Sequence, residues 1–238
     1  MWGGKQGYDY DIESGGLYPG LSADDSTLRW GFIRKVYGIL TTQIVLTAIV
    51  ASVVVFSRPV AMFFVTTPGL PIFLAFLPLI LLCVIHPYRQ SHPINLILLG
   101  IFTVCLSLPV GISCAFTRGD IVLEALILTA AIGFGLTAYT YWAAKRGQDF
   151  SFLGPFLFVA VIILILWGLI QSFFPITSLG TSIYAGIGAL IFSAYIVYDT
   201  DNLIKRFDYD DYVWASIALY LDILNLFLAL LQLLRQSD

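Results

Sequence analysis

Long uncharged stretches alternate with short polar segments along this chain. The first stretch, residues 36–57, has 22 residues without a charge, and a helix of that length crosses a hydrocarbon core of about 30 Å at about 1.5 Å per residue. The uncharged run at 150–198 is too long for one helix, and the residues around Pro175 divide it into two. The pattern predicts an all-α, multi-pass membrane protein with seven transmembrane helices, at about residues 36–57, 69–85, 94–116, 121–144, 152–173, 181–201 and 212–234.

The segment before the first stretch has a different character. Residues 1–33 are polar, acidic and rich in glycine and tyrosine, so they bury too little apolar surface to fold alone. We therefore predict a disordered acidic cytosolic tail at 1–33 and a seven-helix transmembrane domain at 34–238. A cleavable signal peptide is not expected, because such a peptide needs a basic start followed by an apolar run.

The composition agrees with lipid as the solvent of the chain. Hydrophobic residues make up 59% and charged residues 11% of the sequence, with a mean hydropathy of +0.89, whereas soluble domains carry about 25% charged residues. Cys83, Cys105 and Cys114 fall inside apolar stretches, which indicates buried packing residues rather than a disulfide framework or a zinc site. The net charge of -3 gives no support for nucleic-acid binding. We expect membrane lipids as partners and no cofactor.

Lysine and arginine residues are unevenly distributed between the two sides of the predicted bundle. If the N-terminus is cytosolic, three of them lie outside, Arg58, Arg118 and Arg235. Eight lie inside: Arg29, Arg34, Lys35, Arg89, Lys145, Arg146, Lys205 and Arg206. Because positive residues are enriched on the cytosolic side of membrane proteins, a cytosolic N-terminus is predicted. Seven spans then place the C-terminus on the far side, whereas a re-entrant last segment would leave both ends in the cytosol.

An aspartate in the middle of the last stretch is the first candidate functional residue. A charge at the centre of a bilayer costs at least about 2.5 kcal/mol, so Asp222 needs a partner, water or a bound proton. Helical spacing places it on one face with Ala215, Ala218, Asn225 and Ala229, while the other faces are rich in bulky apolar residues. This narrow small and polar seam predicts that the seventh helix is central in the bundle. The alternative is a single packing hydrogen bond from a protonated Asp222.

A second carboxylate lies near the same side of the membrane. Asp199 is close to the end of the sixth stretch, and the short loop that follows makes the last two helices neighbours, so Asp199 and Asp222 could approach each other. Asp201 is expected instead to form a surface pair with Lys205, four residues later. Two close carboxylates in a low dielectric share a proton. Such a pair suits a proton-sensing latch, a calcium site or an aspartyl protease, and the spacing does not choose among them.

Several ordered motifs resemble those of one family. They are IVYDT at 196–200, LYLDILNLF at 219–227, NLILLGIFT at 95–103 and VLEA at 122–125. Together they make residues 34–235 similar to the Bax inhibitor motif family, and LYPG in the acidic tail resembles the Lifeguard branch, particularly its plant members. The resemblance implies a seven-helix fold whose last helix is wrapped by the other six, a calcium leak gated by pH, and suppression of stress-induced cell death.

The resemblance also implies roles for individual residues. The family's proton-sensing aspartates match Asp199 and Asp222, and the arginine that can lock onto them matches Arg89. The surrounding HPYRQSHP departs from the basic cluster of some relatives, which weakens the match of Arg89, and its two histidines are interpreted as ordinary solvated side chains. Glu124 matches an acidic residue of the fourth span that lines an ion path, or reaches the lipid headgroups as the alternative.

We therefore expect a pH-sensitive calcium-leak channel of an internal membrane (endoplasmic reticulum, Golgi or vacuole) or of the plasma membrane. Asp199, Asp222 and Arg89 are its predicted gating residues, and the two aspartates are also its predicted calcium ligands. The expected ion path adds Glu124, Asn225 and Asp201. Calcium ions and cell-death regulators of the membrane are the expected partners, and no enzymatic activity is expected.

Three other classes stay open. An intramembrane aspartyl protease also carries its aspartates on helices six and seven, but its second motif is GxGD, whereas Leu219, Tyr220 and Leu221 precede Asp222 here. These bulky residues prevent the close backbone approach that glycine permits. A seven-helix receptor would have its N-terminus outside, against the count of lysine and arginine residues. A non-conducting scaffold that binds cell-death regulators would need no ion path.

Overall fold

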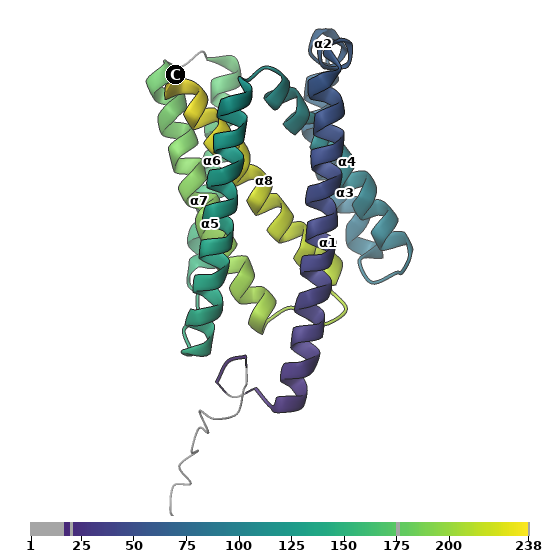
Figure 1. The fold of residues 1–238 in the computed structure, drawn as a ribbon, viewed down its shortest axis with the longest axis vertical. Coiled ribbons are helices and arrows are strands. Elements are labelled where there is room, and N and C mark those ends of the chain that lie inside the picture. Colours follow the sequence, from purple (N-terminus) through teal and green to yellow (C-terminus); the bar gives the residue numbers. More distant parts are fainter. Residues whose placement is uncertain (1–16, 20, 175–176, 238) are drawn as a thin grey trace, which may run out of the picture.

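The computed structural model describes residues 17–19, 21–174 and 177–237, which form eight helices (Figure 1). Six of them are long and apolar enough to cross a membrane, namely all except α2 and α3. The predicted all-helical, multi-pass architecture agrees with this arrangement. The helices are α1 (Ala23–Phe56), α2 (Arg58–Thr66), α3 (Leu70–Tyr88), α4 (Ile94–Ala115), α5 (Gly119–Lys145), α6 (Leu153–Phe173), α7 (Ser178–Lys205) and α8 (Tyr212–Ser237).

The first helix begins well before the predicted first span. Ser22 caps α1, because its hydroxyl oxygen accepts a hydrogen bond from the Asp25 N–H at 3.2 Å. Leu17 is only 1% exposed, and the Phe32 ring packs edge-on against Tyr209 at 6.0 Å. The predicted disordered tail at 1–33 is therefore wrong for its last part, where apolar burial offsets the entropy of ordering. Residues 1–16 lie outside the described residues.

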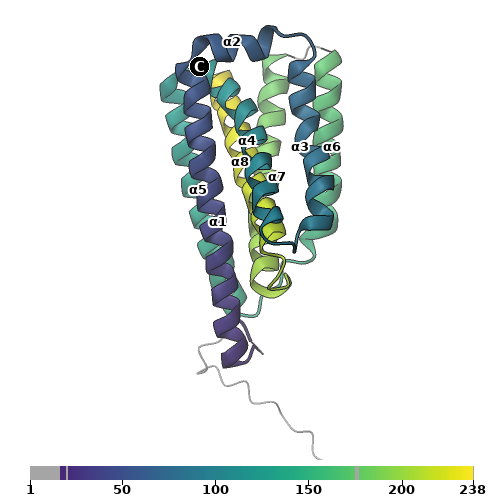
Figure 2. The ribbon, with the colours of Figure 1, turned by 90° about the vertical axis from the view of Figure 1, so that its right-hand side faces the viewer.

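The prolines after the first span do not simply break the chain. Pro59 lies in the first turn of α2, a position that tolerates a missing N–H, so a short helix forms there that the sequence analysis did not predict. Gly69 has a φ of 79° and precedes α3, a left-handed conformation that glycine adopts readily. Figure 2 shows α2 lying across one end of the bundle, with α3 running down from it. Seven spans were predicted, whereas six helices in the described residues have the length and composition of a span. The predicted span that is missing from these six is α3.

The last helix lies at the centre of the molecule. Half of the apolar window of α8 is buried, against 11–33% for the other five long helices. It contacts α1, α4, α5 and α7, whereas α3 packs mainly on α4 and α6 on α7 (Figure 1). The predicted central position is confirmed, but α8 is wrapped by four helices rather than six, because α3 and α6 form an outer layer.

The two ends of the bundle differ in charge. The start of α1 and the α3–α4, α5–α6 and α7–α8 loops lie together at one end, and α2 and the C-terminus lie at the other (Figure 2). We call these the N-terminal end and the C-terminal end. All eight basic residues predicted to be inside belong to the elements of the N-terminal end, so the charge asymmetry of the sequence coincides with the two ends of the fold.

Candidate functional site

Asp199 and Asp222 are brought together by the tight packing of α7 on α8. The two helices are antiparallel and are joined by the short loop at 206–211. Small residues permit their close approach, and a Cβ on Gly188 would lie 3.6 Å from the Cβ of Ala229. The carboxyl groups of Asp199 and Asp222 face each other inside the bundle, close enough to share a hydrogen bond when one of them is protonated. Asp222 is 5% exposed and Asp199 is half-buried.

The chemistry of this contact depends on a proton. An ionised carboxylate only accepts hydrogen bonds, and within the described residues Oδ2 of Asp222 has no donor, although it is buried. Asp199 receives one weak hydrogen bond, from Nδ2 of Asn202 at 3.4 Å. A hydrogen bond between the two aspartates therefore requires that one of them is protonated. The arrangement can hold a single proton between α7 and α8.

Arg89 lies away from this pair. Its Nε is 3.5 Å from Oδ1 of Asp211, and the same oxygen accepts a hydrogen bond from Nε2 of Gln90 at 3.2 Å. Asp211 precedes α8 and lies 11 residues before Asp222, or about 16 Å along a helix axis. The structure therefore brings the two aspartates together and places the third predicted gating residue on a different carboxylate. The gating roles of all three stay predictions.

Asp201 occupies a different environment from the one expected at a surface. It does contact Lys205, as predicted, but its side chain is fully buried. It also pairs with Nη1 of Arg206 at 3.0 Å and accepts a hydrogen bond from the Phe150 N–H at 3.2 Å. The prediction of an exposed surface pair is thus wrong, because the α5–α6 loop covers Asp201.

A second carboxylate, that of Asp149, joins this group of charged residues between α7 and the α5–α6 loop. We call Asp149, Asp201, Lys205 and Arg206 together the clamp. Asp149 in the loop pairs with Nη2 of Arg206. The Ser151 N–H and the Arg206 guanidinium hold the pKa of Asp149 well below its usual range. Asp149 therefore keeps its charge near neutral pH, which makes its pair with Arg206 a structural contact rather than a proton sensor.

The remaining predicted residues make few contacts with the pair. Glu124 is exposed near the start of α5. Asn225 donates to the carbonyl oxygen of Leu221 in its own helix at 2.8 Å. His86 is exposed, as predicted, and its ring also packs edge-on against the Trp214 ring at 5.7 Å, which gives α3 a contact with α8. The ion-path roles of Glu124, Asn225 and Asp201 stay predictions.

The aspartate pair supplies only part of a calcium site. Calcium takes about six to eight oxygen ligands, and the described part of the chain has no cluster of three or more His, Cys, Asp or Glu side chains. Asp199, Asp222 and the Asn202 amide are the polar groups in contact here. This set suits a passing contact on an ion path better than a closed resident calcium site.

A buried polar network on the opposite side of α8 was not predicted. Thr47 and the Tyr220 hydroxyl are 2.7 Å apart, Ser107 donates to Thr47 at 3.2 Å, and Gln43 donates to Thr103 at 3.1 Å. These bonds join α1, α4 and α8. The available signal was the spacing of four residues between Gln43 and Thr47 and between Thr103 and Ser107, which places each polar pair on one helix face.

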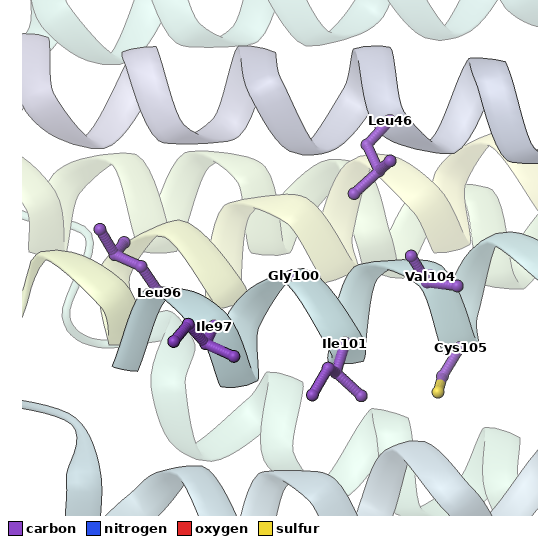
Figure 3. A pocket seen from close by; sticks show the side chains of 7 residues that line it. All are labelled: Leu46, Leu96, Ile97, Gly100, Ile101, Val104 and Cys105. Carbon is purple, nitrogen blue, oxygen red and sulfur yellow. The ribbon is translucent and has the colours of Figure 1, made fainter. Parts of the chain in front are cut away.

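Two hollows lie elsewhere on the molecule. The first, of about 450 Å³, is an apolar depression on the outer side of α4 around Gly100 and Ile101 (Figure 3). The second, which we call the lateral groove, has about 480 Å³ and lies between α1 and α5, with α8 as its floor. Its lining includes Tyr37, Thr137 and Phe227. Neither hollow is lined by Asp199 or Asp222.

Comparison with known proteins gives matches over almost the whole chain. Residues 29–238 match the family model described as Inhibitor of apoptosis-promoting Bax1. The BI1-like protein of Arabidopsis thaliana is 57% identical over 236 residues, covering 98% of this chain and 92% of the relative. Protein LIFEGUARD 4 of the same plant is 53% identical over 237 residues, covering 96% of each chain. The Golgi anti-apoptotic protein of vaccinia virus (strain Lister) is 40% identical over 211 residues, covering 89% of this chain and 87% of the relative.

Proposed function

The chain belongs to the Bax inhibitor family, with the plant LIFEGUARD proteins among its relatives, and we propose that it is an endomembrane protein that suppresses stress-induced cell death by controlling a calcium leak. The first half of this proposal draws on the printed description of the family, an inhibitor of apoptosis-promoting Bax1. The Golgi anti-apoptotic relative from vaccinia virus supports an internal membrane. The second half depends on the aspartate pair.

Seven spans fit the proposed topology better than six. The start of α1 and the end of α8 lie at opposite ends of the bundle (Figure 2), and a chain whose ends lie on opposite sides crosses the membrane an odd number of times. α3 provides the additional crossing, because its 19 residues extend over about 28 Å. The basic residues at the N-terminal end favour the cytosol for that end.

The contact between the Asp199 and Asp222 carboxyl groups is the observation that carries the mechanism. With one proton between them, a hydrogen bond holds α7 against α8. Without that proton, two negative charges face each other in a low dielectric, where like charges repel strongly. The proton thus controls the packing of the central helix, and a loosened α7–α8 interface gives calcium access to the two carboxylates.

Arg89 enters this mechanism as a mobile partner. An ionised pair attracts cations, and Arg89 is the predicted arginine on the same side of the bundle. Arg89 is held by Asp211 in this structure, so it must leave Asp211 before it can approach the pair. Such a movement would carry the end of α3 with it.

Calcium flux from liposomes that contain the purified protein tests this proposal. We expect an efflux above that of protein-free liposomes, changed by Asp199→Ala and by Asp222→Ala. A protein that cleaves a peptide substrate without conducting calcium would instead be an aspartyl protease. Leu219 and Tyr220 are buried directly before Asp222, and this packing does not favour access of a substrate backbone to Asp222.

A further inference from the structure

The lateral groove is a second site that the aspartate pair does not use. α1 and α5 form its walls, and α8 crosses diagonally between them as its floor (Figure 1). Its volume of about 480 Å³ lies within the range of about 300–1,000 Å³ that is typical of small-molecule sites. Ile44, Val55, Leu126 and Phe134 on its walls are exposed. The groove therefore opens sideways, toward the acyl chains of a surrounding bilayer.

The lining of the groove is uncharged throughout. A charged headgroup would find no countercharge inside it, and desolvating that headgroup would cost several kcal/mol. The groove is therefore complementary to a neutral ligand with a large apolar surface.

A cluster of hydroxyl groups lies at one end of the groove. Tyr37 and Thr137 line it, and the Tyr37 hydroxyl is in contact with the hydroxyls of Thr137, Thr200 and Tyr141. The hydroxyl oxygens of Tyr37, Tyr141 and Thr200 are buried, and none of them forms a hydrogen bond of good geometry in the described part of the chain. Because buried polar atoms are normally paired, a further hydroxyl group that enters beside Thr137, which lines the groove and is half-buried, would give the Tyr37 hydroxyl a partner.

The depth of the cluster matches the position of an interfacial hydroxyl. Arg34 and Lys35 belong to the basic N-terminal end, and Tyr37 follows within one turn of α1. Thr137 lies two turns before Lys145, at the same end of α5. The groove continues from Tyr37 to Val55, which is about 27 Å along α1. A ligand with its hydroxyl at the cluster would thus have its apolar body inside the hydrocarbon core.

We propose that the lateral groove binds a sterol, with the sterol hydroxyl at Tyr37 and Thr137 and the ring system on α8. A sterol combines the three required properties, which are neutrality, a single hydroxyl at the interface and a rigid apolar body. The small residues Ala48, Ala130 and Gly133 leave room in the groove for such a rigid body. Binding of this ligand is independent of calcium conduction.

Labelling with a photoreactive sterol tests the site. The full chain in phosphatidylcholine nanodiscs is irradiated with a ring-diazirine sterol, with unlabelled sterol as competitor, and the labelled peptides are identified. We expect saturable labelling on α1, α5 and α8. Gly133→Phe should weaken binding at least tenfold, because a Cβ at Gly133 meets nothing within 4 Å and a larger side chain would fill the groove.

Gly100→Phe is the matched control. Gly100 also has open space at its Cβ, but it lies in the depression on α4 (Figure 3), which has no hydroxyl cluster. This variant should bind the sterol as the wild type does. The hydroxyl contact is tested separately with Tyr37→Phe combined with Thr137→Val and with the sterol methyl ether, each of which should weaken binding about fivefold.

Several results would overturn the sterol site. One such result is labelling that persists in the presence of excess unlabelled sterol. Another is labelling that excess phospholipid abolishes, because bulk acyl chains would then fill the groove. Another is saturable binding that Gly133→Phe leaves unchanged while circular dichroism shows a folded variant. If Gly133→Phe does not fold, equal binding of the sterol and its methyl ether by the wild type would exclude the hydroxyl contact.

Discussion

Three buried or partly buried aspartates differ in what balances their charge. Asp201 is neutralised by Lys205 and Arg206, so its negative charge is stabilised without a proton. Asp199 and Asp222 have each other as their nearest charged groups. For this pair, ionisation of one member raises the cost of ionising the other. Among these three aspartates, the pair is therefore the candidate for coupling a proton to the packing of two helices.

The fully paired Asp201 should be important for stability. Asp201→Asn removes the negative charge and leaves two basic side chains with a neutral partner. We expect the free energy of unfolding to fall by about 2 kcal/mol, the range for a hydrogen bond to a charged group, in a denaturant titration in mixed micelles. Asp120→Asn is the control, because its pair with Arg118 is exposed and such pairs contribute little to stability. Equal losses in both variants would contradict the clamp.

One glycine is required by the contact between α1 and α4. A Cβ at Gly111 would lie 2.9 Å from the Cβ of Val54 and 3.0 Å from the backbone Cα of Ala51. Gly111→Ala should therefore destabilise the protein by about 1–3 kcal/mol, as overpacking does, in the same titration. Gly100→Ala gains the same helix propensity on the same helix with nothing within 4 Å of the new Cβ. A Gly111→Ala variant as stable as Gly100→Ala would show that the helices separate easily.

The sequence identified Asp199 and Asp222 because a carboxylate inside an apolar stretch needs an explanation. It did not identify the partner of Arg89. Asp211 lies in a loop, and loop residues carry no periodic pattern that would place them beside another loop. The helical period likewise put Asp201 beside Lys205, but it could not show that the α5–α6 loop covers both.

At the scale of elements, α3 lies in the outer layer of the bundle and has few contacts with the central helix. It packs mainly on α4 and α2, and its contacts with the α8 region are at its last turn and C-cap, where Arg89 and Gln90 meet Asp211 and His86 meets Trp214. This ion pair is only partly exposed, with the Asp211 side chain 13% exposed, and a contribution of about 1 kcal/mol is enough to shift a two-state equilibrium by about fivefold. A small change at Asp211 can therefore alter the position of this end of α3.

Asp211→Asn should release this end of α3. We expect a longer and broader distance distribution between spin labels at Ser91 and Asp210, measured by electron spin resonance in a cysteine-free background. Asp208→Asn serves as the control, because Asp208 is exposed in the same loop. An unchanged distribution in Asp211→Asn would mean that the ion pair does not hold this end of α3 and that its other contacts are sufficient.

The helix positions could be predicted better than the connections between them. Charged residues at the ends of the apolar stretches placed α4, α5, α6 and α8 within a few residues. Proline residues around 59–71 were interpreted as a break, although proline also begins helices, and α2 was missed. The start of α1 was missed because its first turns are polar and depend on tertiary contacts such as Phe32 with Tyr209.

At the scale of the whole molecule, the seam of small and polar residues in the last helix predicted its central position. The layer formed by α3 and α6 could not be predicted, since their apolar surfaces suit lipid and protein equally.

The topology can be tested directly with single cysteines in a cysteine-free background. We expect an impermeant maleimide to label Gln148→Cys from the cytosol and Thr117→Cys only from the opposite side. The reverse pattern, with Thr117→Cys labelled from the cytosol and Gln148→Cys only from the opposite side, would contradict seven spans with a cytosolic N-terminus.

The central claim is that one proton shared by Asp199 and Asp222 controls the calcium leak. It is tested most directly by calcium efflux from proteoliposomes over a range of pH, for the wild type and for Asp222→Asn. The asparagine amide donates to Asp199 without titrating, so it imitates the proton-bound pair at every pH. We predict that the wild-type leak varies with pH, whereas the variant leak stays at the acid-side level of the wild type. A variant whose leak follows the wild-type pH dependence would contradict the account.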